Sequence, residues 1–170
     1  KVVLFAGSRH PPNVEAVDAI HWIASRLSDP NVMFVIAGNV GDWVDRRDSV
    51  NIRYTGFVND IRPYLESADL AINPVVRGGG TNIKMLEYMA CGLPVISTSF
   101  GIRGLRLRPG RDVMVAEIEE FPAKIEELLS NPEKSAELRS NGRSLVEQHY
   151  SWTSIAQKVS DLYETITRCG

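Results

Sequence analysis

Short apolar runs alternate with amphipathic stretches along this chain, and such alternation is typical of parallel βα units. The apolar runs predict strands over residues 2–6, 32–37, 52–55, 69–75, 94–98 and 112–116. Helical periodicity predicts helices over residues 14–27, 61–67, 82–91, 119–129, 132–149 and 151–167. We therefore expect an α/β fold: a doubly wound parallel six-stranded sheet with helices on both faces and the strand order 3-2-1-4-5-6.

Residues that favour helix ends mark several of these boundaries. Asn13, Asp60 and Ser151 are expected to cap the helices that follow them, because their side-chain oxygens can accept an N–H of the first turn. Pro132 suits a first helical position, where its missing N–H is no loss. Gly92 is expected to end the helix before it, in a C-cap role.

The predicted strand order also indicates where a ligand would bind. In such a sheet, ligands lie beyond the carboxyl ends of the strands, at the point where the winding direction reverses. That point falls between the first and fourth strands, where the loops 7–10 and 76–81 are expected to meet. The second of these loops has the most unusual composition in the chain, with glycine at 78, 79 and 80.

Composition narrows the class of protein. The 170 residues suit one domain, and 19 basic against 21 acidic residues give a net charge of −2, which argues against nucleic acid as a partner. Two cysteines, Cys91 and Cys169, are too few for a disulfide framework, so we expect reduced thiols and a cytoplasmic protein. No apolar run approaches the ~18 residues of a membrane span. Because the chain starts inside its first strand, we expect it to be part of a longer protein.

The segment 78–87 carries the candidate chemistry. Glycines directly before a helix leave backbone N–H groups open to a ligand, and the helix N-terminus adds partial positive charge, which together suit a diphosphate. Lys84 adds a full charge, and Glu87 on the same helical face suits the two hydroxyls of a ribose. These features predict a nucleotide site. The alternative is a tight glycine turn beside a surface ion pair.

Residues 87–97, Glu-Tyr-Met-Ala-Cys-Gly-Leu-Pro-Val-Ile-Ser, closely resemble the EAMACGxPVVAS signature of group 1, the large family of retaining glycosyltransferases with the GT-B fold (family 4-like). Gly-Phe-Val at 56–58 and Ala-Asp-Leu at 68–70 match the same family. So do Phe-Ala-Gly at 5–7 and Tyr-Ser-Trp at 150–152. The resemblance covers essentially the whole chain, as the C-terminal, Rossmann-like half of such an enzyme.

The resemblance implies that residues 1–170 are the C-terminal nucleotide-sugar-binding domain and that the N-terminal acceptor domain is absent. The full-length enzyme would be a hexosyltransferase that moves a sugar from a nucleoside-diphosphate sugar to an acceptor hydroxyl with retention. The isolated half would bind donor without turnover. Lys84 and Arg9 would stabilise the leaving diphosphate, with no metal or other cofactor required. The missing half would bind the acceptor, and it allows peripheral membrane contact.

The family's motifs also assign donor contacts. Glu87 matches the glutamate that binds the ribose, whereas a glutamate eight positions earlier, which contacts the donor sugar in many relatives, is Gly79 here. Sugar contacts would then have to come from the backbone N–H groups of Gly79, Gly80 and Thr81, or from Asn82.

The loop after the first strand departs from the family pattern as well. Gly7, Ser8 and Arg9 are expected to contact the diphosphate, but the lysine that many relatives carry in this loop is replaced, with Asn13 near its place. Elsewhere, Gly38 and Val58 fall where the family packs main chain against the nucleobase. Simple apolar turn packing is the alternative for these two.

Three other functions stay open. A flavodoxin-like regulatory module is expected to carry acidic residues after its first strand, where this chain has Ser8-Arg9-His10. A GT-B epimerase or phosphorylase would need groups from both domains. A non-catalytic nucleotide-sugar-binding module is kept open by the glycine at position 79.

Overall fold

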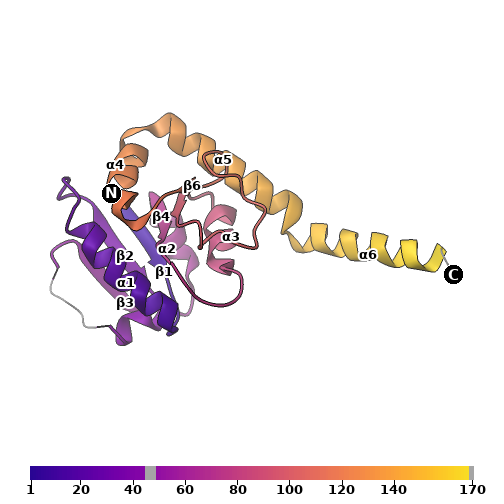
Figure 1. Cartoon of the computed structure of the whole chain (residues 1–170), viewed down its shortest axis with the longest axis horizontal. Helices are drawn as coiled ribbons and strands as arrows, with labels where there is room; N and C mark the ends of the chain where they lie inside the picture. Colours follow the sequence, from indigo (N-terminus) through magenta and orange to yellow (C-terminus); the bar gives the residue numbers. More distant parts are fainter. Residues whose placement is uncertain (45–48, 169–170) are drawn as a thin grey trace.

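The structure of the chain, a computed structural model, describes residues 1–44 and 49–168 (Figure 1). Its centre is a six-stranded sheet in the order β3-β2-β1-β4-β5-β6, in which every neighbouring pair is parallel. The strands are β1 (Val2–Ala6), β2 (Met33–Ala37), β3 (Ile52–Gly56), β4 (Leu70–Asn73), β5 (Val95–Ser97) and β6 (Met114–Val115). The predicted doubly wound sheet and its strand order are confirmed.

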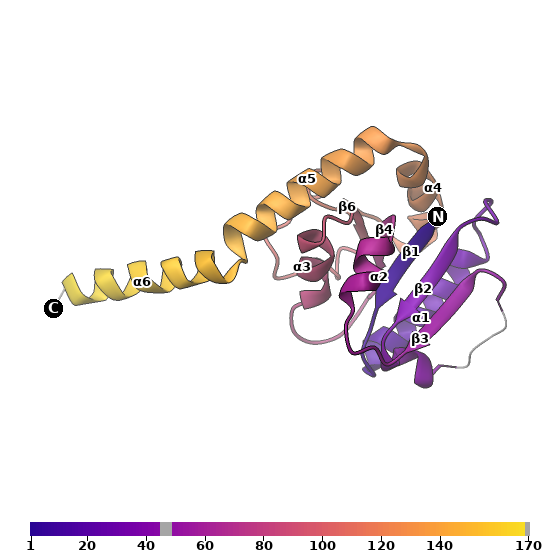
Figure 2. The ribbon, with the colours of Figure 1, turned by 180° about the vertical axis from the view of Figure 1, so that it is seen from behind.

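Helices cover both faces of this sheet, as the sequence predicted (Figures 1 and 2). On one face, α1 (Pro11–Ala24) and α4 (Phe121–Ser130) share an apolar cluster with the strands. On the other, the cluster draws on α2 (Arg62–Ser67), α3 (Ile83–Ala90) and the C-terminal half of α5 (Pro132–His149). Two short 3₁₀ helices complete the body, η1 (Asn39–Asp42) and η2 (Ile118–Glu120).

The alternation of side chains along β1 explains why two clusters form. Val3 and Phe5 belong to the cluster under α1 and α4, whereas Leu4 belongs to the cluster under α3 and α5. All three are at most 1% exposed. Because successive side chains of a strand point to opposite faces, an unbroken apolar run is what a central strand covered on both faces requires.

Several predicted helix boundaries hold, but the N-cap of α2 is Ile61 and not Asp60, and the predicted start of α1 is also wrong. Pro132 opens α5, Gly92 has the positive φ (71°) of a C-cap glycine, and the Ser151 hydroxyl accepts the N–H of Ser154 at 3.2 Å. Helix α1, however, starts at Pro11 with His10 as its N-cap. Asn13 therefore lies inside the first turn and caps nothing, because two prolines with φ suited to a helix begin the helix earlier.

The sheet opens at its switch point, between β1 and β4. These strands pair only at Val3–Leu70 and Leu4–Ala71, and beyond them they diverge. The N–H of Ala6 donates instead to the hydroxyl of the buried Tyr88 on α3, at 2.7 Å. Burial raises the pKa of Tyr88 far above its usual value, so this hydroxyl keeps its proton. The Tyr88 hydroxyl thus replaces the backbone hydrogen bonds between β1 and β4 where the crevice begins.

Helix α6 (Trp152–Arg168) projects from the body of the molecule (Figures 1 and 2). None of its residues is buried, and large apolar side chains recur along it, at Trp152, Ile155, Val159, Leu162, Tyr163 and Ile166. Within the described ranges, none of the helices combines the length and the apolar character that spanning a bilayer requires.

Candidate functional site

Two adjoining cavities lie at the carboxyl ends of β1 and β4, where the sequence predicted a site. The first, of about 180 Å³, is called here the glycine-loop pocket, because Gly78, Gly79, Thr81 and Asn82 line one side of it. The second, of about 400 Å³, is called the Gly38 pocket, and its lining includes Gly7, Gly38, Phe57, Val58 and Glu87. Three residues line both cavities: Ser8, Asn13 and Lys84.

Lys84 lies between the two cavities. Its Nζ donates to Oδ1 of Asn13 at 2.7 Å and lies 4.2 Å from the centre of the Phe5 ring. Burial lowers the pKa of Lys84 to about 7, although the charge of Glu87 acts to raise it. An ammonium held by a neutral amide and an aromatic face lacks a charged partner in direct contact, so an anion placed in either cavity would supply one.

Asn13 positions this lysine, which is a role the sequence did not suggest. Its Nδ2 donates to the carbonyl of Ser8 at 2.9 Å while its Oδ1 accepts from Lys84. The amide therefore ties the loop after β1 to helix α3. The sequence pointed to Asn13 only by its position, which is near the place where many relatives carry a lysine.

The glycine loop has an open face. Gly78 and Gly80 have φ values of 137° and 71°, which residues other than glycine rarely adopt. A Cβ atom at Gly79 or Gly80 would meet nothing within 4 Å, so the space beside their backbone is free. Helix α3 begins directly afterwards at Ile83. The local structure is thus the predicted arrangement of an exposed glycine backbone before a helix N-terminus.

Arg103 stabilises the glycine loop through hydrogen bonds to its carbonyls, and sequence reasoning missed this residue. Its Nη2 donates to the carbonyls of Gly78 at 3.1 Å and Gly80 at 2.8 Å, and its guanidinium stacks on Phe100 at 3.8 Å from the ring centre. The remaining Nη1 is buried with no hydrogen-bond partner in the described part of the chain. No periodicity or motif marked this arginine, because its role depends on a loop that follows β5, 23 residues after Gly80.

The Gly38 pocket combines bare backbone, an apolar wall and one carboxylate. Gly38 has a φ of 102°, and a Cβ there would clash with the carbonyl oxygen of Gly7. The backbone is consequently bare at this wall. Val58 and the 72% exposed ring of Phe57 form an apolar side, and Glu87 lies on the lining with an exposed carboxylate. Phe57 was quoted only as part of a motif, and the structure adds it as an aromatic surface.

Two predicted site residues lie elsewhere. The guanidinium of Arg9 stacks on Trp43 at 3.1 Å from the ring centre and lines a separate cavity on the outer side of α1, with His10 and Glu15. Gly80 does not line the glycine-loop pocket, since its carbonyl faces Arg103. The structure therefore gathers the other predicted residues into one groove, and it leaves these two outside it.

Across residues 1–44 and 49–168, no group of three or more histidine, cysteine, aspartate and glutamate side chains could hold an ion.

The fold and the groove define a Rossmann-like domain with an anion-compatible glycine loop at its switch point. Comparison with known families agrees with this class. The model of the family described as glycosyl transferases group 1 matches residues 1–131, and the chain belongs to that family.

Three known proteins illustrate the similarity. A GDP-mannose-dependent monoacylated α-(1-6)-phosphatidylinositol monomannoside mannosyltransferase from Corynebacterium glutamicum is 27% identical over 165 residues, which cover 89% of this chain and 43% of that protein. The structure of HepE from Anabaena in complex with UDP and glucose is 18% identical, with a TM-score of 0.76, over 96% of this chain and 48% of that one.

The third is the C-terminal domain of a group 1 family glycosyl transferase, LpcC, from Francisella tularensis. It is 18% identical to this chain, with a TM-score of 0.68, and the match covers 89% of this chain and 86% of that one. The chain spans less than half the length of the curated relatives it matches. At these identities, the solved structures support the Rossmann-like fold alone.

Proposed function

We propose that this chain is the C-terminal donor-binding domain of a retaining, family 4-like glycosyltransferase. In this proposal the groove takes a nucleoside-diphosphate sugar, and a second, N-terminal domain binds the acceptor. The observation that carries it is the position of Lys84 between the glycine-loop pocket and the Gly38 pocket, with Glu87 on the lining of the latter. One cation between two cavities suits a ligand whose charge lies at its middle.

The diphosphate would lie at Lys84. In the free protein Lys84 is only partly protonated at neutral pH, because burial lowers its pKa to about 7. A diphosphate would restore the full positive charge, and the N–H groups at the start of α3 would add their partial charge. Both interactions strengthen as charge builds up on the leaving diphosphate, which is what electrostatic catalysis of sugar transfer needs. No metal or other cofactor has a role in this mechanism.

The nucleoside would occupy the Gly38 pocket. Bare backbone at Gly38 lets a flat base approach, Phe57 and Val58 offer an apolar surface, and the Glu87 carboxylate can accept hydrogen bonds from two ribose hydroxyls. The relative from Corynebacterium is named for GDP-mannose, and the Anabaena structure contains UDP and glucose. The identity of the base is therefore left to experiment.

The donor sugar would lie in the glycine-loop pocket. Gly79, Thr81 and Asn82 line this cavity, and the open backbone at Gly79 can offer an N–H where a glutamate is found in many relatives. The Nδ2 of Asn82 donates to the carbonyl of Gly101 at 3.1 Å, which leaves its Oδ1 to accept from a sugar hydroxyl. Arg9 would contribute only after its side chain leaves Trp43.

A second candidate is a module that binds nucleotide sugars without transferring them. The observation that favours it is Gly79, since a glutamate contacts the sugar at that position in many relatives. The two candidates differ in the full-length protein: a transferase turns over donor in the presence of acceptor, and a binding module does not. For either candidate, the proposal includes a cytoplasmic protein whose missing half allows peripheral membrane contact.

Titration calorimetry of the chain with UDP, GDP and ADP tests donor binding. We expect one of them to bind, and Glu87→Ala to weaken that nucleotide by about tenfold while pyrophosphate binding is unchanged, because the carboxylate faces the ribose. The absence of heat with all three nucleotides would refute the proposal. Equal weakening of nucleotide and pyrophosphate would assign Glu87 a structural role instead.

A further inference from the structure

A second polar cavity lies away from the donor groove, between the loop that joins β5 to β6 and the outer side of α5. Its volume is about 370 Å³. Three arginines of the loop line it, together with polar side chains from the C-terminal half of α5: Arg106, Arg108, Arg111, Ser144, Gln148 and His149. This set is called the arginine pocket below. No acidic side chain is among the residues that line it.

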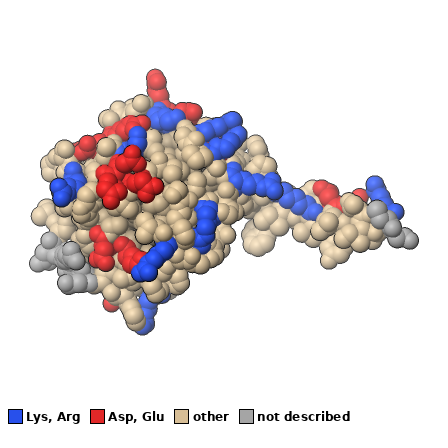
Figure 3. All heavy atoms as spheres, in the orientation of Figure 1, with Lys and Arg blue, Asp and Glu red and all other residues tan. Residues whose placement is uncertain are grey.

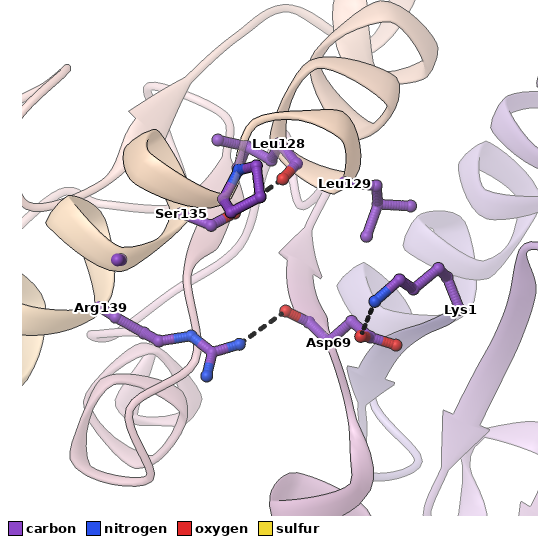
Figure 4. A pocket seen from close by; sticks show the side chains of 8 residues that line it. Lys1, Asp69, Leu128, Leu129, Ser135 and Arg139 are labelled. Carbon is purple, nitrogen blue, oxygen red and sulfur yellow. Dashed lines mark hydrogen bonds and ion pairs between the residues drawn. The ribbon is translucent and has the colours of Figure 1, made fainter.

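The pocket differs from much of the described surface, where many basic side chains pair with carboxylates. Examples are Lys1 with Asp69, Arg62 with Asp60, Arg77 with Glu15, Lys134 with Glu137 and Arg143 with Glu147. Figure 4 shows one such pair in a cavity at the amino ends of β1 and β4, where Lys1 binds the Asp69 carboxylate and Arg139 donates to the Asp69 carbonyl.

One carboxylate, Asp112, lies beside the arginine pocket, and it pairs with only one of the three arginines, Arg108. Asp112 is buried and takes two hydrogen bonds from the Arg108 guanidinium, at 2.8 and 2.9 Å. Burial raises the pKa of Asp112, but the hydrogen bonds from Arg108 outweigh it and the net shift is downward, so the carboxylate is charged. The side chains of Arg106 and Arg111 form no hydrogen bond or ion pair within the described ranges. The pocket therefore keeps an excess of about two positive charges.

Neighbouring groups reinforce this excess. The Nζ of Lys158 donates to the carbonyl of His149 at the rim, at 2.9 Å, which adds another cation. The nearest acid on α5, Glu147, is already bound to Arg143 at 2.7 Å. On the face seen in Figure 3, basic side chains prevail over α5 and toward its junction with α6, whereas acidic ones gather toward the other side of the molecule. The chain as a whole has a net charge of −2, so the concentration of positive charge is local.

The backbone around the pocket is fixed, so the arginines are presented from a defined surface. The N–H of Arg106 donates to the Tyr150 hydroxyl at 2.8 Å, and Nδ2 of Asn141 donates to the carbonyl of Arg111 at 3.0 Å. Guanidinium groups bind phosphate oxygens in pairs, and hydroxyl and amide side chains such as Ser144 can add further hydrogen bonds. Several guanidinium groups around one cavity suit more than one phosphate group.

We propose that the arginine pocket binds a ligand that carries two or more phosphate groups. Several phosphate groups close together are found both in soluble polyphosphorylated compounds and on a membrane surface, where the headgroups of neighbouring anionic phospholipids lie side by side. The site is separate from the donor groove, because Arg106 and Arg111 line neither the glycine-loop pocket nor the Gly38 pocket. It does not depend on the proposed transfer function.

Titration of the ¹⁵N-labelled chain with tripolyphosphate, followed by amide chemical shifts, locates the binding. We expect shifts concentrated in residues 106–111 and 141–149, and the variant Arg106→Gln/Arg111→Gln is expected to weaken binding there at least about tenfold. Arg108 is kept, since its removal would leave Asp112 buried without a partner. The control Arg62→Gln/Lys124→Gln removes the same net charge from basic side chains that pair with Asp60 and Glu127 away from the pocket, and it should change the affinity less than about twofold.

Co-sedimentation with vesicles distinguishes the two sources of phosphate. Binding to phosphatidylglycerol vesicles but not to phosphatidylcholine vesicles, lost in Arg106→Gln/Arg111→Gln, would assign the pocket to lipid headgroups. Tripolyphosphate binding without vesicle binding would assign it to a soluble ligand. The proposal is wrong if tripolyphosphate causes no shifts in residues 106–111 and the vesicles do not bind the chain. It is also wrong if the two double variants weaken binding equally. Shifts confined to residues 79–87 would place the anion in the donor groove and also overturn it.

Discussion

The Nζ of Lys84 lies 2.7 Å from Oδ1 of Asn13, and this hydrogen bond joins α3 to α1 across the crevice between β1 and β4. Asn13 in turn holds the loop after β1 through the carbonyl of Ser8. A neutral partner leaves the lysine poised between its two protonation states, since nothing in direct contact compensates for its burial. The charge at the centre of the groove therefore responds to pH and to an anionic ligand.

The affinity of the chain for UDP is expected to fall as the pH rises above about 7. Burial lowers the pKa of Lys84 to about 7 in the free protein. A diphosphate favours the charged form, so the pKa is higher in the complex. Above pH 7 the lysine must take up a proton on binding, and the affinity then falls by up to about tenfold per pH unit. Calorimetry between pH 6 and 9 measures both the affinity and the proton uptake.

Lys84→Arg is the matched control for this pH dependence. A guanidinium stays charged throughout the range, so the affinity of the variant should change little between pH 7 and 9. If the wild-type affinity were equally constant between pH 7 and 9, with no proton uptake on binding, Lys84 would be fully charged in the free protein.

Lys84→Met is expected to stabilise the domain while it weakens nucleotide binding. The unfolded chain binds a proton at this lysine up to about pH 10.5, whereas the folded chain loses it near pH 7. The free energy of unfolding therefore rises with pH between these values, and the cost of burying the charge is fully present below pH 7. Removing the charge should add about 1 kcal/mol at pH 6, after the loss of the Asn13 hydrogen bond is subtracted. Thermal unfolding at pH 6 and pH 9 tests this, because the difference between variant and wild type should shrink at the higher pH.

Asn13→Asp should separate the electrostatic role of Asn13 from its structural role. A carboxylate in contact with Nζ raises the pKa of Lys84 and competes with the diphosphate for its charge. We expect UDP affinity at pH 6 to fall about tenfold, and the pH dependence to move above pH 8. Asn13→Ala is the control: like Asn13→Asp it removes the hydrogen bond from Nδ2 to the Ser8 carbonyl, but it adds no charge, so its effect on affinity at pH 6 should be small. Equal losses in the two variants would mean that Asn13 acts by shaping the loop alone.

The fold followed from local sequence patterns to a large extent. The unbroken apolar runs around Val3 and Ile72 predicted strands covered on both faces, and both strands are in the sheet centre. The end of β4 at Asn73, earlier than predicted, reflects Pro74, which has no N–H for the ladder. The start of α1 was missed because Pro11 and Pro12 can either precede a helix or begin one, and the sequence pattern does not distinguish these cases.

The groove was predicted where one continuous segment supplies it, as Gly79, Thr81, Lys84 and Glu87 do. It was not predicted where the contact joins distant segments. The aromatic stacking that takes Arg9 to Trp43 depends on how the loop after β2 folds back, and neither residue carries a local signal of it. The hydrogen bonds of Arg103 to the glycine loop are of the same kind. Side-chain contacts across a switch point are set by tertiary packing and are invisible to periodicity.

Arg103→Met is expected to weaken sugar-nucleotide binding without unfolding the domain. The variant loses the hydrogen bonds to the carbonyls of Gly78 and Gly80, so the loop is free to leave the shape that exposes its N–H groups. We expect the affinity for UDP-glucose to fall about tenfold and that for UDP to fall less, since the loop lines the pocket assigned to the sugar. Arg62→Met, which removes an exposed partner of Asp60, serves as the control. If both ligands weaken equally, the loop does not distinguish the sugar.

Tyr88→Phe should destabilise the domain at the same switch point. The hydroxyl of Tyr88 accepts the N–H of Ala6 at 2.7 Å, where β1 has left its ladder with β4. Phenylalanine leaves this part-buried N–H facing a side chain with no acceptor, which costs about 1–3 kcal/mol. Tyr150→Phe is a matched control, because its hydroxyl also accepts a backbone N–H, from Arg106 at 2.8 Å, but in an exposed place where water can replace it. Urea unfolding should show a clearly larger loss for Tyr88→Phe than for Tyr150→Phe, and similar losses would mean that the Ala6 N–H finds another acceptor.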